Sequence, residues 1–440
     1  MTQSGRAITA EDLFRIVVVG NPQASPDGSR IAWVQAQADQ KLDGYRSAIW
    51  IADANGDNAR QLTSGLHCDS DPKWSPCGSF IAFVSNRQTV LPEAGEKDST
   101  KTATPTKAVT QIWTIAIDGG EAVQRTSHPN GADSPAWSPD GTRLAFGAKD
   151  DPTSNEVDEA PSTVGPIADE RVIQSVAYRF DGQGFLERFG HIWTLTLASN
   201  TATQLTFGPA NDSSPTWSPD GSALAFVSNR SKERRLRWNR QAGYVVDVGE
   251  GLVRRITPED ARFSRPAWSP QGDRLAFCGH LGTGSYLIDK IWTVESSGEG
   301  LTCLTEQSDL GFGDSGMGDM ALGGTEGPIW AGEDRLLGLA SVVGETQVYS
   351  IAVDDGSVRP LTAGKQRVSG FAVVEAGLVI SRGGISRPFE LALIQSGAVE
   401  GADITAANAS LRSEVELLEA IDLDLDSADG RKVQGWIIPP

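Results

Sequence analysis

Few residue patterns in this 440-residue sequence have the types and spacing that catalysis needs. A serine nucleophile requires a base and an orienting acid, and the G-x-S-x-G elbow that commonly presents such a serine does not occur. Gly313-Asp314-Ser315-Gly316 sets a serine beside an acid, but in a Gly-rich loop. The overlapping GFGDSG from Gly311 matches G-x-G-x-x-G without the strand and helix that a dinucleotide site requires. We interpret Ser315 as structural and predict no catalytic residue.

Metal-binding patterns are equally weak. No pair of histidines has ligand spacing, and the cysteines form no C-x-x-C motif. These residues are His67, His128, His191, His280, Cys68, Cys77, Cys278 and Cys303. We interpret them as structural histidines and reduced, packed thiols, and expect neither a metal nor a cofactor.

One cluster favours recognition chemistry. Arg171, Tyr178, Arg179 and Arg188 lie close together in the sequence. Guanidinium groups beside aromatic rings suit a peptide carboxylate or carbonyl. Pairing with neighbouring acids such as Asp181 is the structural alternative, and both interpretations stay open at this point.

Charge and composition limit the classes of partner. The chain has 38 basic and 57 acidic residues, a formal charge of -19, which argues against nucleic acid and against an anionic membrane surface. It has no apolar run of 18 residues, and its N-terminus lacks the apolar region of a secretory signal. We therefore expect a cytoplasmic protein. The oligomeric state, a homo-oligomer included, is left open.

The elements that position these residues belong to a repeat, in which eight of the twelve tryptophans fall into two recurring slots. The first slot is P-x-W-S-P-x-G followed by a β-forming run, and the second is I-W-x-[IVL], a turn and a strand ending in Leu-Thr or a similar pair. First-slot copies are PKWSPCGSFIAF from Pro72, PAWSPDGTRLAF from Pro135, PTWSPDGSALAF from Pro215 and PAWSPQGDRLAF from Pro266, with weaker copies from Pro22 and Pro328. The two slots alternate through residue 362, and we interpret their tryptophans as contacts between neighbouring units.

Each slot predicts a β-hairpin, because proline and glycine in S-P-D-G supply the two turn conformations. Two hairpins in about 40–45 residues match one propeller blade. The predicted fold is all-β, a seven-bladed propeller of four-stranded antiparallel blades, with six or eight blades as the error. Blade cores are expected at 22–65, 72–127, 135–207, 215–258, 266–306, 328–363 and, eroded, 370–406. Insertions fall at 87–109, 148–190 and 307–327.

Two flanks lie outside the repeat, which divides the chain into 1–20, 21–410 and 411–440. A capping box at Thr9–Asp12 predicts a short helix to about Val18. Residues 422–438 predict a hairpin about an Asp-Gly turn. Because a folded domain rarely stops one strand later, we expect the sequence to be a fragment.

Together these residues resemble the prolyl oligopeptidase family of serine peptidases, in its acylaminoacyl-peptidase branch. The similarity rests on ITAEDLFRI near the start, the WSPDG repeats, YRFDGQGF from Tyr178 and the closing DGRKVQGWIIPP from Asp429. It implies a propeller that restricts access to an α/β-hydrolase domain carrying a Ser-Asp-His triad, here absent and placed beyond residue 440.

The resemblance implies two partners, a short peptide substrate and the α/β-hydrolase domain of the same parent chain. It makes Arg171, Tyr178 and Arg179 candidate substrate contacts, and it implies that both flanks are poorly anchored without the hydrolase domain. The alternative is a stand-alone propeller that serves as an interaction scaffold, because Tol-like propellers share the repeat.

Overall fold

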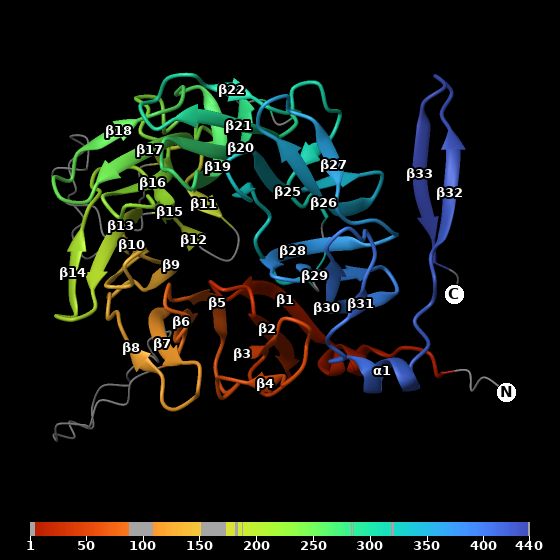
Figure 1. The fold of residues 1–440 in the computed structure, drawn as a ribbon. Coiled ribbons are helices and arrows are strands. Elements are labelled where there is room, and N and C mark those ends of the chain that lie inside the picture. Colours follow the sequence, from red (N-terminus) through yellow and green to blue (C-terminus); the bar gives the residue numbers. More distant parts are fainter. Residues whose placement is uncertain are drawn as a thin grey trace.

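The computed structural model describes residues 5–87, 109–150, 173–180, 184–186, 188–282, 284, 286–316, 318 and 321–438. These residues form a ring of antiparallel sheets around a central channel (Figure 1). In each sheet the strands follow one another from the channel outward, so each sheet is one propeller blade.

Five blades are separate four-stranded sheets. Blade 1 contains β1 (Val17–Ala24), β2 (Arg30–Asp39), β3 (Gly44–Asp53) and β4 (Arg60–Gln61). Blade 2 contains β5 (Asp69–Trp74), β6 (Phe80–Ser85), β7 (Gln111–Ala116) and β8 (Val123–Gln124). Blade 3 contains β9 (Ala132–Trp137), β10 (Arg143–Asp150), β13 (Phe189–Thr196) and β14 (Thr201–Gln204). Blade 4 contains β15 (Asp212–Trp217), β16 (Ala223–Ser228), β17 (Ala242–Asp247) and β18 (Val253–Arg255). Blade 5 contains β19 (Ala261–Trp268), β20 (Arg274–Leu281), β21 (Lys290–Glu295) and β22 (Thr302–Cys303).

The last two blades share one nine-stranded sheet, joined by a single parallel bridge between Thr346 and Arg367. Blade 6 has a divided inner strand, because β23 (Gly311–Phe312) and β24 (Ile329–Trp330) both pair with β25 (Arg335–Val342). It continues with β26 (Glu345–Ala352) and β27 (Val358–Pro360). Blade 7 contains β28 (Arg367–Val374), β29 (Gly377–Gly384), β30 (Arg387–Gln395) and β31 (Ala402–Asp403). The predicted all-β propeller and its eroded seventh unit are confirmed.

Local turn chemistry explains why these residues form hairpins. In the turn after β9, Gly141 has φ +69°, a conformation that glycine adopts without strain. Ser138 Oγ donates to Asp140 Oδ1 at 2.5 Å, and the same carboxylate accepts the Thr142 N–H at 3.0 Å. The S-P-D-G motif therefore satisfies its own polar groups while it reverses the chain.

The first-slot tryptophans connect each blade to the one before it. In five successive blades the indole Nε1 donates to a carbonyl on the preceding inner strand, at 3.0–3.1 Å. The pairs are Trp74 with Gln23, Trp137 with Lys73, Trp217 with Ala136, Trp268 with Thr216 and Trp330 with Ala267. The prediction that these tryptophans lie between blades is confirmed.

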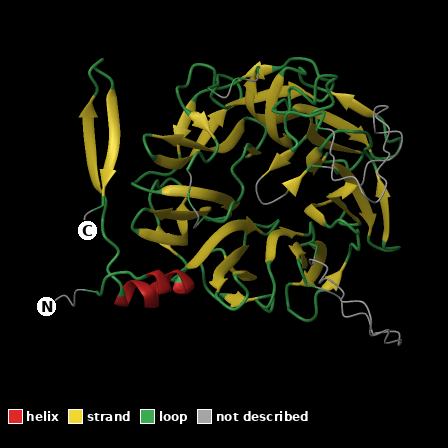
Figure 2. Cartoon of the chain, turned by 180° about the vertical axis from the view of Figure 1, so that it is seen from behind, coloured by secondary structure: helices red, strands yellow, loops and turns green. Residues whose placement is uncertain are grey.

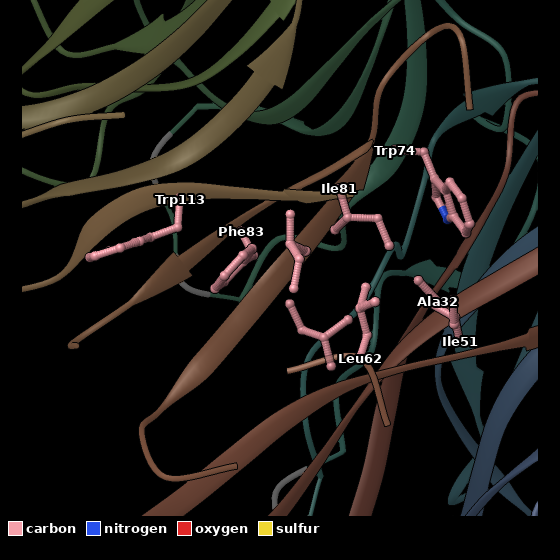
Figure 3. Close-up of a cluster of buried hydrophobic side chains, with 9 residues drawn as sticks. Ala32, Ile51, Leu62, Trp74, Ile81, Phe83 and Trp113 are labelled. Carbon is pink, nitrogen blue, oxygen red and sulfur yellow. The ribbon is translucent and has the colours of Figure 1, made fainter. Parts of the chain in front are cut away.

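The hydrophobic core is divided into clusters that span neighbouring blades. In the cluster between blades 1 and 2, Ile81 and Phe83 (Figure 3) are completely buried, as is Ile49. Trp74 lies at the edge of this cluster, where its ring covers aliphatic side chains and its Nε1 reaches the neighbouring strand. Burial between blades, rather than within one blade, holds the ring together.

The ring closes without exchange of strands, because every blade consists of strands that follow one another in the sequence. Blades 7 and 1 share a core that includes Val19, Trp33 and Leu391. Ser381 Oγ donates to the Val19 carbonyl at 2.9 Å. Side chains therefore perform the closure that a shared strand would otherwise provide.

The N-terminal flank differs from what the sequence predicts. The expected helix to Val18 is a 3₁₀ helix, η1 (Ala10–Arg15), and the chain enters β1 at Val17. Arg6 N donates to the Glu414 carbonyl and Glu416 N donates to the Arg6 carbonyl, both at 2.9 Å. The N-terminal segment is thus tied to α1 (Ala409–Glu414), and the expectation that it is poorly anchored is wrong.

The predicted C-terminal hairpin is present as β32 (Ile421–Asp426) and β33 (Lys432–Ile437). It stands beside the ring, next to the last two blades (Figures 1 and 2). Of the four cysteines, Cys278 is buried, Cys68 and Cys303 are half-buried, and Cys77 is exposed, so the packed-thiol interpretation does not hold for Cys77. No helix in the described part of the chain is long and apolar enough to cross a membrane.

Candidate functional site

The long connections of the propeller gather on one face. Each blade starts at the channel with its inner strand, so the connections between second and third strands all lie at the same end of their blades. The described part of the insertion at 148–190 and the segment 229–241 belong to connections of this kind, whereas most of the insertion at 87–109 lies outside the described residues. Loops on a rigid scaffold commonly carry binding residues, so this face is the candidate functional surface.

The C-terminal hairpin contacts the same face. Lys365 forms an ion pair with Asp422, and Ser386 Oγ donates to Glu419 at 3.1 Å. At the turn between β25 and β26, a Cβ on Gly344 would lie 2.5 Å from the Trp436 ring. The chain therefore leaves the propeller on the face that carries the insertions.

The structure places the predicted site residues differently. Arg171 lies outside the described residues. Tyr178 and Arg179 lie on a small exposed hairpin formed by β11 (Arg179–Phe180) and β12 (Gly184–Phe185). The Arg179 guanidinium lies 5.8 Å from the centre of the Phe185 ring, and the rings of Tyr178 and Phe185 are 6.3 Å apart. Neither residue lines the cavities beside the hairpin.

Beneath this hairpin is a cavity of about 450 Å³, which we call the arginine cavity. Its described lining comes from the 173–189 segment, from 209–211 and 229–241, and from the start of blade 5. Five of the lining residues are arginines and none is an aspartate or glutamate: Arg188, Arg234, Arg235, Arg240 and Arg262. Arg188 was part of the predicted cluster, and the other four were not predicted.

Aromatic and amide groups complete the arginine cavity. Phe180 and Trp238 meet edge to face, with ring centres 5.8 Å apart. Asn211, Asn239 and Gln241 also line the space. The cavity therefore combines cationic donors, neutral donors and an apolar wall.

Several contacts orient the arginines. Arg240 forms ion pairs with Glu233 and Asp260, both at 3.1 Å. Arg234 Nε donates to the Pro209 carbonyl at 2.8 Å. Arg235 Nη1 donates to the amide oxygen of Gln174 at 2.6 Å, which joins the 229–241 segment to the insertion. These bonds hold guanidinium groups from one connection against the hairpin of another.

The arginine cavity continues into the central channel. A second cavity of about 290 Å³ shares Phe180, Leu186, Arg188 and Asn211 with it. This second cavity in turn shares Ser134, Ser214 and Pro215 with a central cavity of about 1210 Å³. A continuous path therefore leads from the insertion hairpin to the axis of the ring.

The central cavity is lined by inner-strand residues that precede a proline. These residues have φ between 49° and 57°, a left-handed conformation that a bulge in each inner strand imposes. They are Asn21, Asp71, Ser134, Ser214 and Arg265. Across the cavity Arg265 pairs with Glu326 at 2.5 Å, so the loop before β24 is anchored to blade 5. The central cavity therefore combines polar side chains at these bulges with a wall of tryptophan and proline side chains.

The remaining sequence candidates are structural. Asp314 pairs with Arg367 at 2.8 Å, and Ser315 N donates to Ser341 Oγ at 2.9 Å, so this loop joins blades 6 and 7. His128 Nε2 lies 2.9 Å from Asp150. No group of three or more metal-ligating side chains is found in the described ranges.

A different signal in the sequence would have found the arginine cavity. Residues 230–240 hold six basic side chains and one acidic side chain in a protein of charge -19. Such a local reversal of charge marks an electrostatic feature. The repeated slots identify the turns and strands of each blade. This basic run matches neither slot, because it lies in the connection between β16 and β17 of blade 4.

Comparison with known proteins agrees with this architecture. A family model described as the TolB β-propeller domain matches residues 184–310. The uncharacterized peptidase YuxL of Bacillus subtilis is 29% identical over 440 residues, covering 99% of this chain and 64% of the relative. Dipeptidyl-peptidase 5 of Porphyromonas endodontalis is 22% identical and covers all of this chain and 61% of the relative. The chain thus spans less than two thirds of the length of these relatives.

Among solved structures, the acylaminoacyl peptidase of Pyrococcus horikoshii superposes with a TM-score of 0.70 at 18% identity. The match covers 97% of this chain and 58% of that one. At this identity the likeness concerns the fold. Sequence relatives and fold together confirm the resemblance, and the chain is similar over its length to the TolB-like propeller portion of peptidases of the prolyl oligopeptidase family.

Proposed function

We propose that this chain is the substrate-gating propeller portion of a cytoplasmic serine peptidase. The parent protein hydrolyses short or acylated peptides with a Ser-Asp-His triad in an α/β-hydrolase domain that follows residue 440. One observation carries the proposal: the C-terminal hairpin, the insertion hairpin and the path to the channel share one face. A catalytic domain attached through β33 would cover this face, and the three connected cavities would then open toward it.

The physical role of the propeller is selection by size. A rigid ring admits an extended peptide, whose backbone groups can bond to the polar residues of the channel lining, and excludes a folded protein. The chain itself contributes binding and exclusion of water. The chemistry belongs to the proposed domain, where a positioned serine, histidine and acid would act together.

The test uses the extended protein encoded by the reading frame downstream of Pro440. A fluorophosphonate probe should label the extended protein at one serine and leave the 440-residue chain unlabelled. The extended protein should cleave short peptides and leave intact a folded protein that contains the same peptide sequence. Labelling of the 440-residue chain, or cleavage of folded substrate at the same rate, would contradict the proposal.

A second candidate is a stand-alone Tol-like scaffold that binds another protein. The TolB family match at residues 184–310 favours it. A stop codon directly after Pro440 in the source gene, together with no labelling of any extended product, would support the scaffold instead.

A further inference from the structure

The arginine cavity is a cationic site within an acidic protein. Its described lining contains five arginines and no carboxylate, whereas the chain as a whole has 57 acidic and 38 basic residues. Part of this charge is balanced, because Arg240 pairs with Glu233 and Asp260. A guanidinium carries five N–H donors, so an arginine that keeps one such contact can still donate to a bound anion. The composition of the lining therefore points to an anionic ligand.

The shape of the hydrogen-bond donors in the arginine cavity indicates which anions fit it. A guanidinium presents a planar fork that matches a carboxylate or a phosphate. Amide groups of Asn211, Asn239 and Gln241 add neutral donors, and Phe180 with Trp238 forms an apolar wall at the same space. A carboxylate that stands next to an apolar side chain satisfies both features, and peptides carry this combination.

The position of the cavity fits a peptide end. The cavity lies between the connections of blades 3 and 4 and the start of blade 5, and it continues through the second cavity to the channel. Its volume of about 450 Å³ is within the range of small-molecule sites and too small for a folded partner. A bound peptide can keep its carboxylate in the cavity while its remaining residues extend toward the axis.

We infer that the arginine cavity binds the carboxylate of a short peptide, supplied either by its C-terminus or by an acidic side chain. This inference rests on the proposed function for its substrate class, and it assigns to the propeller a preference for anionic peptides. Arg262 and Arg234 hold the carboxylate, and Trp238 contacts the neighbouring side chain.

Binding to the 440-residue chain tests the inference without any hydrolysis. The probe is an Ala-Ala-Phe peptide with an uncharged coumarin on its N-terminus and a free C-terminal carboxylate, compared with the same labelled peptide as the C-terminal amide and with a labelled Ala-Glu-Phe amide. The free acid should bind at least about tenfold more tightly than the amide, as expected for loss of a charged hydrogen bond. Recovery of affinity by the Ala-Glu-Phe amide identifies an acidic side chain as the source, and no recovery identifies the C-terminus.

Two variants and a matched control locate the site. Arg262→Gln and Arg234→Gln should each weaken binding of the favoured peptide about tenfold. Arg237→Gln removes the same charge from the same segment, does not line the cavity, and should leave affinity unchanged. Thermal melting checks that each variant is folded.

Equal binding of acid and amides, no binding of any peptide, or equal weakening by Arg237→Gln would overturn the inference. The proposed function fails by a different readout, the absence of fluorophosphonate labelling in the extended protein. If the 440-residue chain binds the free acid while the extended protein stays unlabelled, the anion site is supported and the proposed peptidase function is contradicted.

Discussion

At the residue scale, a threonine repeated in every blade anchors the third strand. Its hydroxyl accepts the backbone N–H of a residue fourteen positions earlier, at 2.8–3.0 Å. The pairs are Ile49 with Thr63, Ile112 with Thr126, Ile192 with Thr206, Gly243 with Thr257, Ile291 with Thr305, Val348 with Thr362 and Leu391 with Thr405. Seven such bonds, including one in the eroded seventh unit, define seven blades independently of the tryptophans.

Replacing Thr206 by valine keeps the shape of the side chain and removes the acceptor. Because the buried Ile192 N–H then has no hydrogen-bond acceptor, the free energy of unfolding should fall by about 1–3 kcal/mol. Urea denaturation measures the change. Thr206→Ser retains the hydroxyl and is the control, and a loss as large as that of valine would contradict the hydrogen-bond argument.

The S-P-D-G aspartates make stability depend on pH. Hydrogen bonds from Ser138 and from the Thr142 N–H lower the pKa of Asp140 to about 2. The pKa of Asp27 is likewise lowered to about 2, chiefly by Ser25. A carboxyl whose folded pKa lies below its unfolded value of about 3.9 contributes stability above pH 4. That contribution is lost as the pH falls from about 4 to about 2.

Asp140→Asn should therefore lower stability at neutral pH and reduce the loss between pH 4 and pH 2. Urea unfolding at a series of pH values measures both effects. The chain offers a converse variant, because the equivalent turn position in blade 2 is Cys77, and Cys77→Asp should raise stability at neutral pH. An unchanged pH dependence in Asp140→Asn would show that these turn carboxylates do not contribute.

At the element scale, buried ion pairs fasten the start of an inner strand to the connection that follows the second strand. Arg87 pairs with Asp69 at 2.6 Å in blade 2, and Arg230 pairs with Asp212 at 2.5 Å in blade 4. Both carboxylates are fully buried. In blade 4 this pair fixes the first residues of the 229–241 segment, so it positions one wall of the arginine cavity.

Arg87→Met should be strongly destabilising, because it leaves the Asp69 carboxylate buried without its counter-charge. Removal of one partner of such a pair costs about 3–5 kcal/mol. The double variant Asp69→Asn with Arg87→Met removes both charges and should recover part of this loss. Chemical denaturation of the wild type, Arg87→Met and the double variant measures both losses, and equal losses in the single and double variants would argue against a buried charge as the cause.

The sequence predicted these elements unevenly. Blade borders followed from Trp, Pro and Gly at repeated positions, because turn conformation and strand alternation are local properties. The sequence places Tyr178 and Arg179 in an insertion of blade 3, but it does not identify the 229–241 segment, which bonds to that insertion. Contact between connections of two blades depends on their rotation about the ring axis, which no local pattern encodes.

At the scale of the whole molecule, polar contacts between the chain ends add to the hydrophobic core that blades 7 and 1 share. The side-chain amide of Asn408 bonds to both the N–H and the carbonyl of Val17, at 2.9 Å each. Glu390, which is 2% exposed, accepts the Asn408 N–H at 2.8 Å. This cluster holds blade 1 against blade 7 where no strand is shared.

Asn408→Ala should open this seam and leave the other blades intact. Amide hydrogen exchange should accelerate at Val17–Val19 while the protection of blade 4 stays the same, because local opening does not require global unfolding. Ser410→Ala, an exposed change in the same segment, is the control. Uniform acceleration across all blades would show instead that the ring unfolds as one unit.

The sequence by itself determined the repeat, the four-stranded blade and the C-terminal hairpin, and it predicted seven blades with six or eight as the error. These follow from short-range rules: S-P-D-G reverses the chain, alternating apolar residues form strands, and regular spacing repeats the unit. Only the tertiary structure decided how the ring closes, that Arg6 pairs with the 414–416 segment, and that arginines from two connections line one cavity. Those contacts join residues far apart in the sequence, and their partners are selected by the closed geometry of the ring rather than by any neighbouring residue.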